Sequence, residues 1–307
     1  MPHAAIHHLL ALRVLERWRD TPAAAPFEVA SATRNGFLHG SLGPDMGYFP
    51  GADPLLSRLA HHARTGALCR ALVAEARSEV ERAYAWGWVT HVLADVAVHP
   101  LVNDACGELL RGERVPVWGE SAAVTHLRVE IGLDAVYCAR HLELCAIRLE
   151  PALGPSGVRF VARAFARTYG AAPAAESVLT AHRQVTRLAG PLSALQQVSA
   201  RALGEAGGTV DRALRAGAAL PLRVISTFCP PDSHARGLFS PVRPPAWMLA
   251  EVNDVVAGFP DWFDGHYRSN LQFLRDHCLD TGEVDPHDPP AAAAAIRELA
   301  GPARLAA

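Results

Sequence analysis

The sequence predicts an all-α protein, a bundle of many helices. Three observations support this fold class. Apolar residues recur at helical spacing along most of the chain, and the apolar–polar alternation typical of strands is hard to find. Half of the 307 residues are hydrophobic and only 20% are charged, which supplies a core and argues against disorder. No repeat of solenoid length is present.

The N-terminal half begins with an amphipathic helix over residues 4–19, whose apolar stripe includes Ile6, Leu9 and Leu10. The following segment, residues 20–54, is rich in Gly and Pro and is interpreted as a loop. Apolar periodicity then predicts four more helices, over residues 54–75, 77–98, 100–111 and 121–148.

The C-terminal half follows a break at Pro151–Gly157. Periodicity predicts helices over residues 158–168, 174–205 and 208–218. A Pro-rich passage at 229–245 cannot form one continuous helix, because proline lacks an N–H and clashes with the preceding turn. Two further helices are expected over residues 246–257 and 259–277.

Charge and composition exclude several classes of partner. The chain has 29 basic and 31 acidic residues, so its formal charge is −2, which gives no reason to expect a double-stranded nucleic acid partner or an anionic-membrane anchor. The sequence contains no run of 18 consecutive apolar residues, so no transmembrane helix is predicted. The six widely spaced cysteines and the lack of a cationic N-terminal region lead us to expect reduced thiols and a cytoplasmic protein.

A histidine-bearing apolar stretch, WGWVTHVLADVAVHPLVN, spans residues 86–103. His91 and Asp95 are four residues apart, so a helix would project them from one face, about 6 Å apart at Cβ. His99 follows one turn later, about 40° further around the axis. The intervening residues are almost wholly apolar, so this helix is expected to be buried. A buried carboxylate needs a paired cation or a metal ion, because dehydrating it alone is costly.

A second stretch, THLRVEIGLD at residues 125–134, repeats this spacing. His126 and Glu130 are again four residues apart, and Asp134 extends the same face by another turn. Two antiparallel helices that each present a histidine and a carboxylate are typical of metal sites inside helical bundles.

Two shorter elements carry further donors. LGPDMGYFPG places Asp45 on a turn fixed by Gly and Pro, and LAHHARTG contains adjacent His61 and His62, of which only one can face a given partner. Each element alone has a simpler explanation: a helical His–Asp pair is commonly a hydrogen-bonded core pair, and His126–Glu130 could be surface electrostatics. Four such elements between residues 42 and 134 favour a polynuclear metal site.

In this order the motifs resemble the bacterial zinc-dependent phospholipase C domain family, whose superfamily also contains single-strand nucleases. The resemblance rests on GPDMGYFPG, His61/His62, THVLADVAVHPLVN and HLRVEIGLD, and it extends from about residue 3 to residue 134. The order Asp, His, His-x-x-x-Asp, His, His-x-x-x-Glu is that family's ligand order. It implies an all-α multi-helix bundle of the phospholipase C and single-strand nuclease type.

The resemblance also implies a ligand set of two or three zinc ions. The first ion would be held by Asp45, one of His61 or His62, His91 and Asp95. The second would be held by His99, His126 and Glu130. Asp95 and Glu130 would be shared with a third ion, completed by an N-terminal histidine, namely His7, His8 or His3. His39, Asp53 and Asp134 are candidates for orienting these ligands.

This sequence departs from the secreted members of the family in two places, and both concern the predicted metal ligands. Those enzymes lose a signal peptide and use the exposed terminal tryptophan as a ligand, whereas this chain starts Met1-Pro2-His3, so the third ion's ligand set is incomplete. The spacing from Asp95 to His99 is also two residues shorter. His99 remains on the same helix at that spacing and stays in the predicted set.

The activity that the resemblance implies is phosphoester hydrolysis, in which metal-activated water attacks phosphorus. Asp45 is expected in addition to orient or deprotonate that water. The mixed N/O donor set suits zinc, and also iron or manganese. The substrate is left open between a lipid or small-molecule phosphodiester, single-stranded nucleic acid and a phosphomonoester.

The alternative from another class is a non-catalytic helical protein with a structural metal site, in which protein ligands saturate the ion. We interpret residues 1–150 as the metal-binding helical core and residues 151–307 as helices that complete the same bundle in one domain. The oligomeric state is not predicted.

Overall fold

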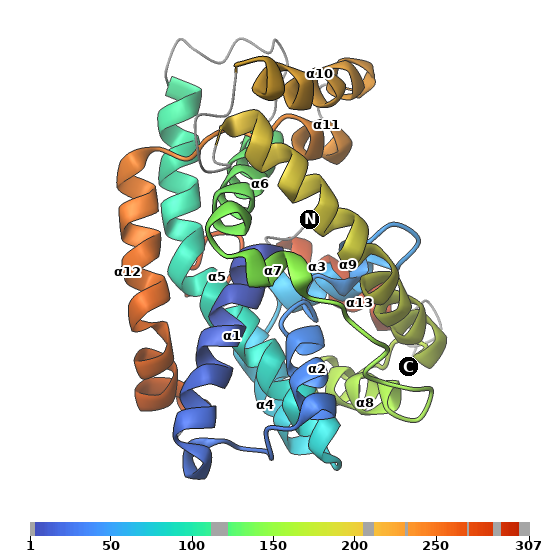
Figure 1. Ribbon diagram of the computed structural model, residues 1–307. Helices are drawn as coiled ribbons and strands as arrows, with labels where there is room; N and C mark the ends of the chain where they lie inside the picture. Colours follow the sequence, from blue (N-terminus) through green and yellow to red (C-terminus); the bar gives the residue numbers. More distant parts are fainter. Residues whose placement is uncertain are drawn as a thin grey trace. The chain divides into compact units, whose positions relative to one another are not determined.

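The computed structural model describes residues 4–111, 122–204, 212–230, 233–268, 270–284 and 290–300. Regular structure in these residues is helical (Figure 1), and the only strand-like feature is an isolated antiparallel bridge between His277 and Val284. The predicted all-α fold is therefore confirmed. Within the described ranges, no helix has both the length and the apolar content that crossing a bilayer requires.

The α-helices are α1 (Ala4–Asp20), α2 (Ser31–Gly40), α3 (Pro54–His62), α4 (Thr65–Glu75), α5 (Glu79–Arg111), α6 (Ala122–Arg140), α7 (Leu142–Ala146), α8 (Val158–Tyr169), α9 (Ala175–Leu203), α10 (Arg212–Phe228), α11 (His234–Phe239), α12 (Ala246–Trp262) and α13 (Pro290–Ala300). Short 3-10 turns form at Pro22–Ala24, Met46–Tyr48 and Leu271–Phe273, and a π-helical turn forms at Phe263–Arg268.

The chain forms two compact units. Unit 1 consists of Met1–Leu9, Pro100–Arg148 and Ala189–Val255, and unit 2 of Leu10–His99, Leu149–Leu188 and Val256–Ala307. Helices α1, α5, α9 and α12 each contribute residues to both units. The predicted domain organisation, a core over 1–150 completed by 151–307, stays a prediction.

Helix α2 lies where the sequence predicts a loop. Its glycines, which indicate a loop locally, instead permit close packing of α2 on α5. A Cβ on Gly40 would lie 2.0 Å from the Tyr84 carbonyl oxygen, and one on Gly87 would lie 2.1 Å from that of Phe37. Burial of Phe37 against this face stabilises a helix whose intrinsic propensity is poor.

The predicted helix over residues 54–75 is divided into α3 and α4. Arg64 adopts a left-handed conformation with φ of 50°, which ends the first helix. The Tyr169 hydroxyl donates to the carbonyls of Leu59 and Ala63, at 3.2 and 2.8 Å, so the end of α3 is satisfied by a side chain distant in sequence.

In contrast, the predicted break before Pro100 does not occur, because α5 continues through it as one helix of 33 residues (Figure 1). Proline removes one hydrogen bond of the helix. The buried side chains of Val98 and Val102 on either side of Pro100 offset that loss.

The C-terminal helices also differ from their predicted bounds. Helix α12 continues through Gly258 and Pro260 to Trp262, and the predicted helix over 259–277 does not extend beyond the π-helical turn. Helix α11 forms inside the Pro-rich passage, where Ser233 accepts a hydrogen bond from the Arg236 N–H and caps it. The predicted helix over 174–205 matches α9, and α10 extends ten residues beyond the predicted end at 218.

The core of unit 2 is aromatic. Trp18 packs edge-on against Phe27, Phe37 and Phe263, with ring centroids 5.4 to 5.9 Å apart. In the same unit α4 packs against α8, and α3 packs against α4 and α13. In unit 1, α6 packs against α7 and α11, and α11 packs against α10. These contacts hold α3 in unit 2 and α6 in unit 1, and both helices carry predicted ligands.

Candidate metal centre

Five predicted ligands form a continuous run of alternating imidazole and carboxylate groups within unit 2. They come from the turn after α2, from α3 and from α5: His61, Asp45, His91, Asp95 and His99. Each of these residues is at most 5% exposed.

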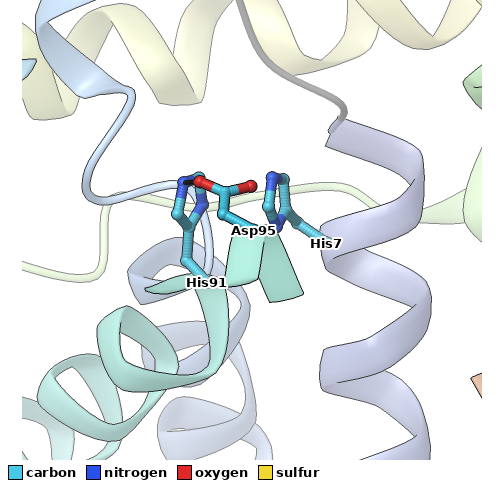
Figure 2. A group of neighbouring side chains, drawn as sticks. All are labelled: His7, His91 and Asp95. Atoms are coloured by element: carbon cyan, nitrogen blue, oxygen red, sulfur yellow. Dashed lines mark ion pairs between the residues drawn. The ribbon is translucent and has the colours of Figure 1, made fainter. Parts of the chain in front are cut away.

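The run is held by close contacts between Nε2 atoms and carboxylate oxygens. His61 and His91 approach the two oxygens of Asp45, at 3.1 and 3.8 Å. The Asp95 carboxylate lies 3.1 Å from His91 and 3.5 Å from His99. The four-residue spacing predicted for α5 is thus realised: His91 and Asp95 project from successive turns and meet (Figure 2).

The Nδ1 atom of each histidine in the run is held by a backbone carbonyl. His91 Nδ1 lies 2.8 Å from the Ser41 oxygen, and His61 Nδ1 lies 2.9 Å from the Ser57 oxygen. His99 Nδ1 contacts the oxygen of Leu279. A carbonyl can only accept a hydrogen bond, so Nδ1 carries a proton in each of these rings. Nε2, which faces the carboxylates, is therefore the atom that can bind a metal ion when the imidazole is neutral.

The electrostatics of the run follow from its burial. Burial lowers the pKa of His61, but the hydrogen bond and negative charge of Asp45 outweigh that effect, and the pKa rises from 6.5 to about 8. Two buried carboxylates within one cluster need cationic partners, because their hydration has been removed. A divalent cation would meet this need more fully than a shared proton.

The two adjacent histidines of α3 face different partners. His61 joins the run, whereas His62 lies with its Nδ1 3.7 Å from the Cys278 thiol and its Nε2 3.7 Å from the Asp280 carboxylate. The structure therefore places His61, and not His62, beside Asp45. The sequence left this choice open.

In unit 1, the predicted pair on α6 is also formed. His126 Nε2 lies 2.7 Å from the Glu130 carboxylate, and His126 Nδ1 lies 3.0 Å from the Asn103 side-chain oxygen. This is the same arrangement as in unit 2, with the amide oxygen of Asn103 in place of a backbone carbonyl. Glu130 is 6% exposed.

Asp134, one turn beyond Glu130, holds the start of α1. Its carboxylate accepts hydrogen bonds from the backbone N–H groups of Ala5 and Ile6, at 3.2 and 3.1 Å, and from the Gln196 amide. Burial raises the pKa of Asp134 well above 3.8, although these hydrogen bonds act in the opposite direction. Asp134 thereby positions the turn of α1 that carries His7.

The remaining candidates lie as follows. His7, labelled in Figure 2, and His8 are buried residues of α1 in unit 1. His39 bonds the Thr186 hydroxyl at 2.9 Å and stacks on the His182 ring. Asp53 caps α3 by accepting the Leu55 N–H at 3.0 Å. His3 lies outside the described residues.

Several residues that position the histidines were not identified from the sequence. The oxygens of Ser41, Ser57 and Leu279 are backbone atoms, so no side-chain pattern marks them. Asn103 could have been identified from the sequence, because it is the last residue of the histidine-bearing motif on α5. Leu279 lies on a turn that contacts α3. Its backbone N–H donates a hydrogen bond to the His61 carbonyl at 2.8 Å.

The donor chemistry of unit 2 fits a zinc ion. Asp45, His61 and His91 each offer one ligand atom, and these three atoms lie within 4.8 Å of one another. Neutral imidazole and carboxylate are ordinary zinc ligands, and metal-binding histidines commonly donate their second N–H to a carbonyl. The Nδ1 contacts of His61 and His91 satisfy that condition.

The comparison with protein families gives one result. The family described as zinc-dependent phospholipase C matches residues 5–182, a span that includes α1 to α8 and every predicted ligand except His3. No curated protein and no solved structure matches the chain. The match covers more than half of the sequence and agrees with the donor set, so the chain belongs to the zinc-dependent phospholipase C family.

Proposed function

We propose that this protein is a zinc-dependent phosphodiesterase of the phospholipase C type. The observation that carries the proposal is the buried run of three imidazoles and two carboxylates in unit 2, with every Nε2 turned toward a carboxylate. Family membership supports the coarser assignment, a zinc phosphoester hydrolase. Location in the cytoplasm, expected from the sequence, remains part of the proposal.

Bound zinc would supply two effects, neutralisation of the phosphoester oxygens and a lower pKa for a water molecule at the site. The residues of the chain bind the ion and orient the attacking water. His61 and His91, held by the carbonyls of Ser57 and Ser41, are proposed as fixed ligands. Asp45 is proposed as the group that orients the attacking water and takes its proton, because its carboxylate lies between His61 and His91, the two proposed histidine ligands.

The proposal includes two or three ions in each chain. His126 and Glu130 of α6, together with His99, are retained as ligands of a second ion, and His7 is retained for a third. This part rests on the order of the motifs and on the oriented His126–Glu130 pair within unit 1. Zinc is proposed over iron or manganese because of the family.

The first test is elemental analysis of the purified protein, combined with hydrolysis of bis(p-nitrophenyl) phosphate. We expect two to three equivalents of zinc and measurable turnover. His91→Ala and Glu130→Ala should each abolish turnover and lower the zinc content while helicity by circular dichroism is kept. His141→Ala is the matched control, because His141 forms a similar pair with Glu143 at the surface, at 3.2 Å.

Protein without zinc that still hydrolyses phosphodiesters, or turnover unchanged in both variants, would refute the assignment. A non-catalytic structural site would instead bind zinc and show no turnover. Comparison of a phosphocholine diester, a phosphomonoester and single-stranded DNA as substrates would then separate the phosphodiesterase from the phosphomonoesterase and nuclease alternatives.

A further inference from the structure

Tyr48 lies beside the run of imidazoles and carboxylates in unit 2, and the protein leaves its hydroxyl unpaired. The ring packs on the imidazole of His61, with centroids 5.2 Å apart, and the side chain is half-buried. The hydroxyl forms no hydrogen bond with any residue that the structure describes. Tyrosine hydroxyls enclosed by protein usually have a hydrogen-bond partner, so an unpaired one at this place indicates a role in binding a ligand.

The backbone around Tyr48 is fixed, and this sets the position of the hydroxyl. Tyr48 ends the 3-10 turn that follows Asp45, and its N–H donates to the Asp45 carbonyl at 2.8 Å. The Gly47 N–H donates to the Ser57 hydroxyl at 2.8 Å, and a Cβ on Gly47 would lie 2.4 Å from the Asp53 carbonyl oxygen. The turn therefore packs closely against α3, which holds Tyr48 at a fixed place relative to Asp45.

The charges around the hydroxyl place it at the metal centre. Burial raises the pKa of the Tyr48 hydroxyl, and Asp280 and Asp45 raise it further. The hydroxyl is thus within electrostatic range of Asp45, a proposed ligand. Arg58 acts in the opposite direction, and it is itself paired with Glu298 at 2.7 Å. A phenol with its ordinary pKa of about 10 is already neutral at pH 7, so the hydroxyl is available as a hydrogen-bond donor.

The run itself supplies acceptors and metal-binding atoms. Its carboxylate oxygens, and the Nε2 atoms that face them, carry no proton to donate when the imidazoles are neutral. A phosphodiester presents unprotonated oxygens, which can only accept hydrogen bonds, so a donor has to come from a residue beside the run. The hydroxyl of Tyr48 is such a donor. Because the turn already fixes its position, little conformational entropy is lost when a ligand binds.

We propose that the Tyr48 hydroxyl donates a hydrogen bond to a phosphoryl oxygen of the bound phosphoester, which makes Tyr48 a substrate-binding residue of the centre. The inference rests on the proposed function, and it adds a contact to the phosphoryl group that the metal ligands do not provide. Inorganic phosphate shares the phosphoryl oxygens of a phosphoester and is therefore a suitable probe.

The test is calorimetric titration of the zinc-loaded, full-length protein with inorganic phosphate, for the unmodified protein and for Tyr48→Phe. Phenylalanine keeps the ring on His61 and removes only the hydroxyl. Loss of a hydrogen bond to a charged ligand should weaken phosphate binding at least about tenfold. The kcat/KM for bis(p-nitrophenyl) phosphate should fall to a similar extent, and the zinc content by elemental analysis should be unchanged.

A second measurement separates substrate binding from a structural role. Because the hydroxyl has no partner among the described residues, its removal should leave the free energy of urea unfolding, measured without phosphate, equal or higher. Tyr84→Phe is the matched control, since Tyr84 is a buried tyrosine of the same unit whose hydroxyl contacts the Met46 sulfur at 3.8 Å. Its phosphate affinity should equal that of the unmodified protein.

Three outcomes would overturn the inference. The unmodified protein with zinc could bind no phosphate. Tyr48→Phe could bind phosphate as tightly as Tyr84→Phe does. Tyr48→Phe could also lose zinc or stability, which would make the hydroxyl a structural group. Phosphate binding is measured without turnover, so a protein that binds phosphate through Tyr48 and hydrolyses no phosphoester would refute the proposed activity and leave this contact standing.

Discussion

His182 of α9 makes the stability of the protein sensitive to mild acid. Its ring is 1% exposed, and its Nε2 accepts hydrogen bonds from the backbone N–H groups of Ala152 and Leu153, at 3.2 and 3.0 Å. The aromatic neighbours are His39, stacked with a centroid distance of 4.0 Å, and Tyr84 at 6.0 Å. Protonation of Nε2 would place a buried charge against two donors.

Burial accordingly lowers the pKa of His182 from 6.5 to about 4. Because the unfolded chain binds the proton more readily, stability from this group is complete above pH 6.5 and is lost as the pH falls toward 4. The difference between 6.5 and about 4 corresponds to about 3 kcal/mol of unfolding free energy, of which about 2 kcal/mol is already lost at pH 5.

The measurement is urea unfolding, followed by circular dichroism between pH 7.5 and pH 4.5, of the unmodified protein and His182→Gln. Glutamine can present an acceptor oxygen near the Nε2 position and does not titrate. Loss of metal at low pH affects both proteins, so the difference between their unfolding free energies isolates His182. We expect this difference to shift by about 2 kcal/mol, in favour of the variant, on going to pH 5. If the unfolding free energies of the two proteins changed with pH by the same amount, the reasoning would be refuted.

Two further predictions concern backbone packing. Gly132→Ala should destabilise unit 1 by roughly 3 kcal/mol or more, because its Cβ would lie 1.7 Å from the Val242 carbonyl oxygen; Gly217→Ala, which has open space, should be neutral or stabilising, and similar losses in both would contradict this account. Asp276→Ala should cost about 1 kcal/mol in urea unfolding, because the carboxylate accepts the Ala67 N–H at the start of α4, at 3.0 Å. An unchanged midpoint for Asp276→Ala would show that this cap contributes nothing.

Local spacing explains what could be predicted of the site. The pairs His91–Asp95 and His126–Glu130 lie four residues apart, and one helical turn brings such residues together whatever surrounds them. Both pairs form as expected. The same reasoning predicted the helices themselves, because apolar periodicity is a property of the segment.

Local reasoning failed where distant segments decide the outcome. The glycines of α2 indicate a loop, but Gly40 and Gly87 allow two backbones to approach and so place the Ser41 carbonyl at His91. Pro100 predicts a helix end, but buried residues on both sides keep α5 continuous. In each case tertiary burial outweighs a local preference of about 1–3 kcal/mol.

The sequence by itself determined the all-α class, the order of the metal-binding motifs and the family to which they point, because these depend on residue type and spacing. Only the tertiary structure decided that His61 rather than His62 meets Asp45, and which atoms hold each Nδ1. The oxygens of Ser41 and Leu279 are 50 and 180 residues away from the histidines that they orient. Contacts of that range are set by how helices and turns pack, and a periodic pattern within one segment carries no information about them.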